Sequence, residues 1–209
     1  MRLHAYFDYG SPYAYLAWQR MTHLHAERYA DVEVLWKPVS AGHIFKMDGS
    51  APNTTMQNQG AYLWKDVARW AAAYGVPFAP PPNDSPARMP VNSINAMRLH
   101  FLADQGGPEL EAAWMDAVFH AYFRDGRDIS DPSVLEDLCQ QVGVQDGPQA
   151  CNHESVKRLL IANTAEAYEK GAPGVPYFVL ETDEGEEVFW GNDRCAWLEA
   201  RIAGSEPPA

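Results

Sequence analysis

The N-terminus carries a strand-like run that stops at a glycine, directly before a helix start. Residues 3–9 have the alternating apolar pattern of a strand, Gly10 ends the run, and Ser11-Pro12 follows. Serine is a favoured N-cap, and proline is favoured at the first helical position because its missing N–H has no helical partner there. A helix N-terminus also stabilises an anion. Ser11 therefore either caps its own helix only or also contacts a bound thiolate or carboxylate.

Strand patterns occur at both ends of the chain. A helix over 12–29 and a strand over 32–39 complete an opening β-α-β unit, and 177–190 has the pattern of a hairpin followed by a last helix. Neither end alone makes a viable sheet, so the two ends are expected to share one. Between them the sequence favours helices only, over 60–74, 92–105, 108–124, 131–142 and 153–170.

This arrangement predicts the fold class and the domain organisation. We expect an α/β protein whose sheet domain consists of residues 1–41 and 171–209, interrupted by an all-helical insertion over 42–170. The cleft between the two units is the expected ligand site. Trp70 and Trp190 are expected in the core.

Composition excludes several function classes. A net charge of −12 argues against a nucleic-acid surface but leaves an anionic small molecule possible. The three cysteines, Cys139, Cys151 and Cys195, have neither C-x-x-C spacing nor the spacing of a zinc site. This predicts a reduced, cytoplasmic protein. Cys195 is expected to be buried. The N-terminus has no signal-peptide pattern and no run is apolar enough to cross a membrane. The seven histidines are scattered, so no metal is expected.

Five segments in order resemble those of one known family, from residue 3 to about 202. They are 7–13 (F-D-Y-G-S-P-Y), 63–77 (L-W-K-D-V-A-R-W-A-A-A-Y-G-V-P), 126–130 (G-R-D-I-S), 174–176 (G-V-P) and 189–194 (F-W-G-N-D-R). Together they resemble the 2-hydroxychromene-2-carboxylate isomerases and the related kappa-class glutathione transferases, within the DsbA-like thioredoxin-fold superfamily. The resemblance implies a thioredoxin-like fold, β-α-β … β-β-α, with a helical insertion.

The resemblance also assigns roles at the first helix and the third strand. Ser11 would be the catalytic residue that hydrogen-bonds the sulfur of glutathione, with Pro12 and Tyr13 beside it. Val175 would pair its backbone with the cysteinyl unit, and Pro176 would be a cis proline facing Ser11. The redox members have C-x-x-C at the first helix. Since that pair is absent here, disulfide exchange is not expected.

Four further positions are implied for the rest of the ligand. Asn192 and Asp193 would hold the γ-glutamyl end of glutathione. Asn53 would supply an amide near the sulfur and the substrate, and Arg88 would pair with a substrate carboxylate. The loop over 49–53 departs from the family's G-N-x-P-P, so either Asn53 or Ser50 fills the amide position.

The leading hypothesis is therefore a glutathione-dependent isomerase of bacterial aromatic, naphthalene-type catabolism. Glutathione thiolate would add reversibly to 2-hydroxychromene-2-carboxylate in its ring-opened form and leave trans-o-hydroxybenzylidenepyruvate. One alternative is a kappa-like transferase that releases the conjugate of an electrophile, and another is a non-catalytic thioredoxin-fold binding domain. The implied partners are a small aromatic carboxylate and, as in the family, a second copy of the chain in a homodimer.

Overall fold

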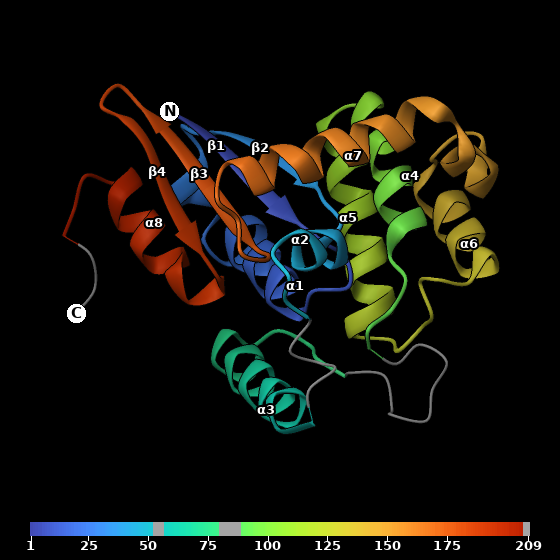
Figure 1. The fold of residues 1–209 in the computed structure, drawn as a ribbon, viewed down its shortest axis with the longest axis horizontal. Coiled ribbons are helices and arrows are strands. Elements are labelled where there is room, and N and C mark those ends of the chain that lie inside the picture. The colour runs from blue at the N-terminus through green and yellow to red at the C-terminus, as the bar shows by residue number, and fades with distance from the viewer. Residues whose placement is uncertain (52–56, 80–88, 207–209) are drawn as a thin grey trace.

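The computed structural model describes residues 1–51, 57–79 and 89–206, and centres on one four-stranded sheet (Figure 1). The strands are ordered β2-β1-β3-β4. Strand β1 (Arg2–Phe7) pairs in parallel with β2 (Glu33–Pro38) and antiparallel with β3 (Tyr177–Thr182), which pairs antiparallel with β4 (Gly185–Trp190). Both ends of the chain therefore contribute to one sheet, as the sequence predicts.

Alternate side chains of β1 enter two different cores. Ala5 packs with helix α1 (Pro12–Gln19) and with α8 (Cys195–Ile202) on one face. Tyr6 packs on the other face, which α2 (Ala41–Met47) and α7 (Glu154–Glu169) cover. The period-2 alternation of a strand explains this division, because neighbouring side chains point to opposite faces.

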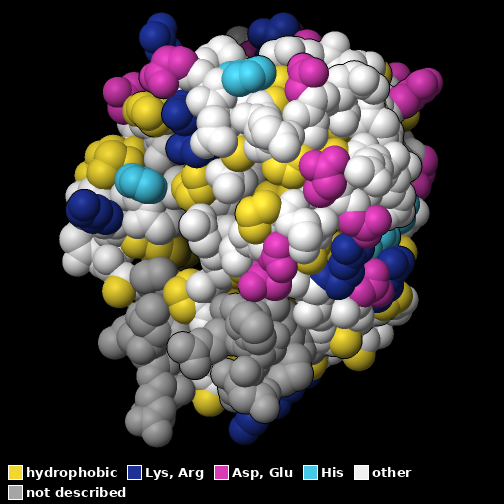
Figure 2. All heavy atoms as spheres, turned by 90° about the vertical axis from the view of Figure 1, so that its right-hand side faces the viewer, with side chains coloured by type: hydrophobic (Ala, Val, Ile, Leu, Met, Phe, Trp, Pro, Cys, Tyr) yellow, Lys and Arg dark blue, Asp and Glu magenta, His cyan; other side chains and the backbone are white. Residues whose placement is uncertain are grey.

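Part of the central helical segment packs against the sheet unit. The segment includes α3 (Gln57–Tyr74), α4 (Ile94–Gln105), α5 (Pro108–Phe123), α6 (Pro132–Val142) and the 3₁₀ turn η4 (Gly147–Asn152). Phe7 and Trp18 from the sheet unit share one buried cluster with Trp114 and Phe119 of α5. This core is continuous across the expected boundary at residue 41. The division into two domains stays a prediction. Figure 2 shows acidic and basic side chains interspersed on the side that lies at the right of Figure 1.

The first helix is shorter than the expected 12–29. Pro12 stands at its first turn and Ser11 is the N-cap, whose Oγ accepts a hydrogen bond from the Ala14 N–H at 3.3 Å. After α1 the chain continues as a π-helical turn, η1 (Arg20–Leu24), and a 3₁₀ turn, η2 (Ala26–Tyr29). Arg20 pairs there with Glu199 of α8, which ties the end of α1 to the last helix.

Helix α2 is an addition to the predicted elements. Its signals are Ser40 at the N-cap, the apolar Ile44, which is fully buried, and Lys46 in the last turn. The helix is only seven residues long and contains Gly42, so its sequence pattern is weak. Within the described residues no helix is long and apolar enough to cross a membrane.

Candidate functional site

A cavity of about 1390 Å³ lies where the start of α1, the helices α2 and α3, the loop before β3 and the end of β4 meet. Several predicted residues line it together: Ser11, Pro12, Tyr13, Val175, Asn192 and Asp193. Pro176 lies beside them and is buried. Ser50 also lines the cavity, and its Oγ donates to the Phe45 carbonyl at 3.3 Å. Asn53 and Arg88 fall outside the described residues.

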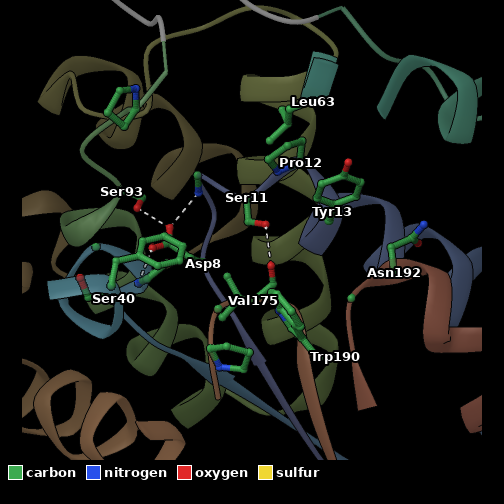
Figure 3. Close-up of a pocket in the computed structure, with 18 of the residues that line it drawn as sticks. Asp8, Ser11, Pro12, Tyr13, Ser40, Leu63, Ser93, Val175, Trp190 and Asn192 are labelled. Atoms are coloured by element: carbon green, nitrogen blue, oxygen red, sulfur yellow. Dashed lines mark hydrogen bonds between the residues drawn. The ribbon is translucent and has the colours of Figure 1, made fainter. Parts of the chain in front are cut away.

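Ser11 and Val175 face each other across this cavity (Figure 3). The Ser11 Oγ donates a hydrogen bond to the Val175 carbonyl oxygen at 3.2 Å. The peptide bond between Val175 and Pro176 is cis. The hydroxyl at the α1 N-terminus therefore lies against the loop that precedes β3, although 164 positions separate the two residues.

Asp8 links three elements around the site. Asp8 is part of the 7–13 motif, but the sequence alone assigns it no role. Its carboxylate accepts hydrogen bonds from the Gly10 N–H at 2.8 Å, the Ala41 N–H at 3.0 Å and the Ser93 hydroxyl (Figure 3). These donors belong to the turn before Ser11, the start of α2 and the segment before α4. Burial raises the pKa of this carboxyl, while the three hydrogen bonds oppose that rise.

The segment after β4 presents a buried amide and an exposed carboxylate. Asn192 is 2% exposed, and neither its amide oxygen nor its amide nitrogen has a hydrogen-bond partner among the described residues. Asp193 is exposed and forms an ion pair with Arg194 at 3.1 Å. A buried amide group without partners costs about 1–3 kcal/mol.

Tyr13 joins the start of α1 to α3. Its hydroxyl donates to the Asp66 carboxylate at 2.8 Å. Burial, followed by this hydrogen bond, raises the pKa of the Tyr13 hydroxyl. The phenol therefore stays protonated, and both side chains form a fixed wall of the cavity.

Helix α2 adds two basic side chains to the cavity lining. His43 and Lys46 both line the cavity, and both are exposed. The ring nitrogen Nδ1 of His43 lies 2.7 Å from the Ser40 Oγ. Lys46 has no ion pair within the described part of the chain. Two residues three positions apart share a face of a helix. Sequence reasoning missed His43 and Lys46 because it did not predict helix α2.

The expectation that Trp190 is a core residue is wrong. Its side chain is 54% exposed and lines the cavity beside Val175 (Figure 3). The reason is topological, because β4 is an edge strand and Trp190 lies on the face opposite to Phe189, which packs against the core. Trp70 packs with the Leu16 cluster between α1 and α3 and also lines the cavity.

In the part of the chain that the structure describes, the cavity lining includes no cysteine and no metal site. Cys139, Cys151 and Cys195 are buried thiols without disulfide partners. Among the described residues, no group of three or more His, Cys, Asp or Glu side chains is arranged to hold a metal ion. The site thus presents a hydroxyl, backbone groups, a buried amide, carboxylates and cationic side chains, a set suited to a peptide-like ligand that carries both charges.

A sheet whose Ser11 helix faces a cis-proline loop defines a thioredoxin-like protein, and the comparisons with known proteins agree. The family model of the DSBA-like thioredoxin domain matches residues 2–203, so the chain belongs to that family. The predicted α/β, thioredoxin-like fold class is thereby confirmed.

Within this family the chain is similar to isomerases and to kappa-class glutathione transferases. A 2-hydroxychromene-2-carboxylate isomerase of Pseudomonas putida is 26% identical, over 94% of this chain and 92% of its own. Glutathione S-transferase kappa 1 of Caenorhabditis elegans is 23% identical, over 92% and 87%. A solved structure of a 2-hydroxychromene-2-carboxylate isomerase superposes with a TM-score of 0.83 at 25% identity, over 98% of this chain and 95% of the other. The predicted resemblance to these isomerases is confirmed.

Proposed function

We propose that this chain is a glutathione-dependent isomerase that interconverts 2-hydroxychromene-2-carboxylate and trans-o-hydroxybenzylidenepyruvate. The observation that carries the proposal is the Ser11 hydroxyl, which lies at the N-terminus of α1 and faces the Val175 carbonyl inside one large cavity. The isomerases and the kappa-class transferases among its relatives support the choice of ligand and reaction.

Glutathione supplies the sulfur nucleophile that the protein lacks at this position. A free thiol has a pKa of about 8.5, and a helix N-terminus lowers it. In the structure the Ser11 hydroxyl donates to Val175 instead. On binding, that hydroxyl turns to the thiolate, and the released Val175 carbonyl accepts the cysteinyl N–H. The start of α1, with Pro12 and Tyr13, stabilises the sulfur charge.

The γ-glutamyl end fits the segment after β4. The Asn192 amide has unmet donors and an unmet acceptor in the cavity wall, which suit the α-carboxylate and α-amino groups. Asp193 adds a negative charge for the ammonium group, and its ion pair with Arg194 is exposed and therefore weak.

The reaction is covalent catalysis by the bound thiolate. The thiolate adds to the β-carbon of the ring-opened, conjugated substrate, which turns its C=C bond into a single bond. Rotation about that bond and loss of the thiolate give the trans product and regenerate glutathione. Lys46 lines the cavity as a cationic partner for a substrate carboxylate. Asn53 and Arg88 stay predicted substrate contacts.

The biological setting is proposed with the reaction. We place the enzyme in cytoplasmic, naphthalene-type aromatic catabolism, where buried thiols remain reduced. The family resemblance implies a homodimer. Sedimentation equilibrium should therefore give twice the mass of the 209-residue chain, and a monomer at micromolar concentration would contradict this.

The decisive experiment follows the absorbance of 2-hydroxychromene-2-carboxylate with and without glutathione. Wild type should convert it only with glutathione. Ser11→Ala should lower kcat/KM by about 10²-fold, the usual effect of removing one donor to a catalytic anion. Ser11→Thr keeps a hydroxyl and should retain more activity than Ser11→Ala. Ser155→Ala, on the exposed side of α7, is the matched control.

The same assay separates the alternatives. No glutathione-dependent rate would reject the isomerase. A glutathione conjugate released at the rate of substrate loss would instead identify a transferase, the activity that the kappa-class relatives are named for. Glutathione binding by calorimetry, with no turnover of either kind, would identify a binding domain.

A further inference from the structure

The cavity contains one imidazole whose orientation is fixed by the protein. His43 Nδ1 lies 2.7 Å from the Ser40 Oγ, and Ser40 is itself 7% exposed. The Ser40 backbone N–H donates to the Thr164 Oγ1 at 3.0 Å, which fixes this residue against α7. With Nδ1 held by Ser40, the other ring nitrogen, Nε2, is left for a ligand in the cavity that His43 lines.

A shared carboxylate connects the start of α2, the helix that carries His43, to the Ser11 turn. Asp8 accepts one hydrogen bond from Ala41, two residues before His43, and another from Gly10, directly before Ser11. The backbone N–H of Ser11 also donates to the Asp8 carbonyl at 2.9 Å. The start of α2 and the start of α1 are therefore fixed relative to each other.

Several other acid–base groups of the cavity are already engaged, and Lys46, which has no ion pair in the described part of the chain, carries an ammonium that has no acceptor for a proton. Asp8 accepts three hydrogen bonds, and Tyr13 donates to Asp66. Asp193 pairs with Arg194. An imidazole both accepts and donates protons near neutral pH and is the commonest proton carrier in enzymes.

We propose that His43 carries the proton when the chromene ring opens, a role that rests on the proposed function. Nε2 removes the proton of the C2 hydroxyl, and the C2–O1 bond breaks with its electron pair going to O1. The ketone forms at C2, and the imidazolium returns its proton to the phenolate oxygen. No proton is gained or lost overall, and the product is the conjugated enone to which the thiolate adds.

Ser40 makes both halves of this transfer possible. A serine hydroxyl is a donor and an acceptor. Nδ1–H donates to the Ser40 Oγ throughout the transfer, which leaves Nε2 free to accept the proton, and the imidazolium keeps this hydrogen bond until Nε2 gives the proton back. Ser40 is thus the positioning residue for His43.

The test compares two substrates in the same variants. Cis-o-methoxybenzylidenepyruvate, prepared by irradiating the trans isomer, is already open and has no ring oxygen to protonate. His43→Gln should lower kcat for the chromene by about 10²-fold. It should change the glutathione-dependent isomerisation of the methyl ether less than 3-fold. His153→Gln, exposed at the start of α7 and outside the cavity, is the matched control and should resemble wild type.

Added imidazole should restore chromene turnover in His43→Gln by at least 10-fold, without effect on wild type. Equal losses with both substrates would overturn the proposal, because they would indicate a binding role. An unchanged chromene rate or an absence of imidazole rescue would also overturn it. Failure of wild type to convert either substrate with glutathione would instead reject the proposed function, and this inference with it.

Discussion

Replacing Arg20 with methionine should destabilise the folded protein by about 3 kcal/mol. Arg20 holds the Glu199 carboxylate with two hydrogen bonds, Nε to Oε1 at 2.6 Å and Nη2 to Oε2 at 2.8 Å. The Glu199 side chain is 1% exposed and that of Arg20 is 14% exposed. Without Arg20 the buried carboxylate has lost its bidentate partner, which raises the free energy of the folded state.

The magnitude follows from what remains beside Glu199. Breaking a buried ion pair costs about 3–5 kcal/mol. The Nη1 atom of Arg28 stays 3.4 Å from the carboxylate, and the Tyr29 hydroxyl donates to it at 3.4 Å, so the lower end applies. For a domain of this length, 1 kcal/mol changes Tm by about 2–4 °C, so Tm should fall by about 6–12 °C.

Urea unfolding at pH 7 measures this loss, and a double variant tests its cause. Arg20→Met with Glu199→Met removes both charges and should return to within about 1 kcal/mol of wild type. The control Arg158→Met breaks an exposed pair with Glu154 and should cost under about 0.5 kcal/mol. A loss below about 1 kcal/mol in Arg20→Met, or a double variant as unstable as the sum of its singles, would refute the reasoning.

Three further predictions concern a turn, the thiols and pH. Gly191→Ala should weaken glutathione binding measured by calorimetry. Gly191 has a φ of 99°, and an added Cβ would lie 2.6 Å from a carboxylate oxygen of Asp193. An unchanged affinity would contradict this prediction. Burial raises the pKa of Cys139 to about 11 and that of Cys195 to about 12, so native protein should not react with a thiol-specific disulfide reagent at pH 8, whereas all three thiols should react in urea. Burial raises the pKa of Glu166, but hydrogen bonds, first that from Lys37, outweigh it and hold the pKa below 4.5. Its stabilising contribution is present above pH 4.5 and lost as pH falls through the lowered pKa. Glu166→Gln should therefore reduce the unfolding free energy at pH 7, and this reduction should shrink as the pH is lowered; a reduction that does not change with pH would argue against the ion pair.

Local chemistry explains why the start of the site could be predicted. Ser11 and Pro12 form a cap with a known preference, and the alternating run before them is a strand signal that needs no other part of the chain. The pairing of β1 with β3 also follows, because an isolated strand pair at either end is marginal. Placing Val175 opposite Ser11 required the family resemblance, since a cis X-Pro bond has no sequence signal strong enough to predict it.

Non-local contacts explain what the sequence could not predict. Helix α2 depends on Asp8, whose carboxylate accepts the Ala41 N–H from 33 positions away, and no local pattern encodes that bond. Trp190 is exposed because β4 became the edge of the sheet, which depends on strand order rather than on the residue itself. His43 lies on α2, so its place in the cavity wall could not be predicted from the local sequence either. The roles of Asn53 and Arg88 stay predictions.

The order of strands determines when the sheet can be completed during synthesis. Strand β1 leaves the ribosome about 170 residues before its antiparallel neighbour β3. Until then β1 has one open edge, and contacts of such long sequence separation form slowly. A nascent chain stopped before Tyr177 should therefore lack glutathione affinity and depend on chaperones, so the length of the helical segment sets how long the unfinished sheet is exposed.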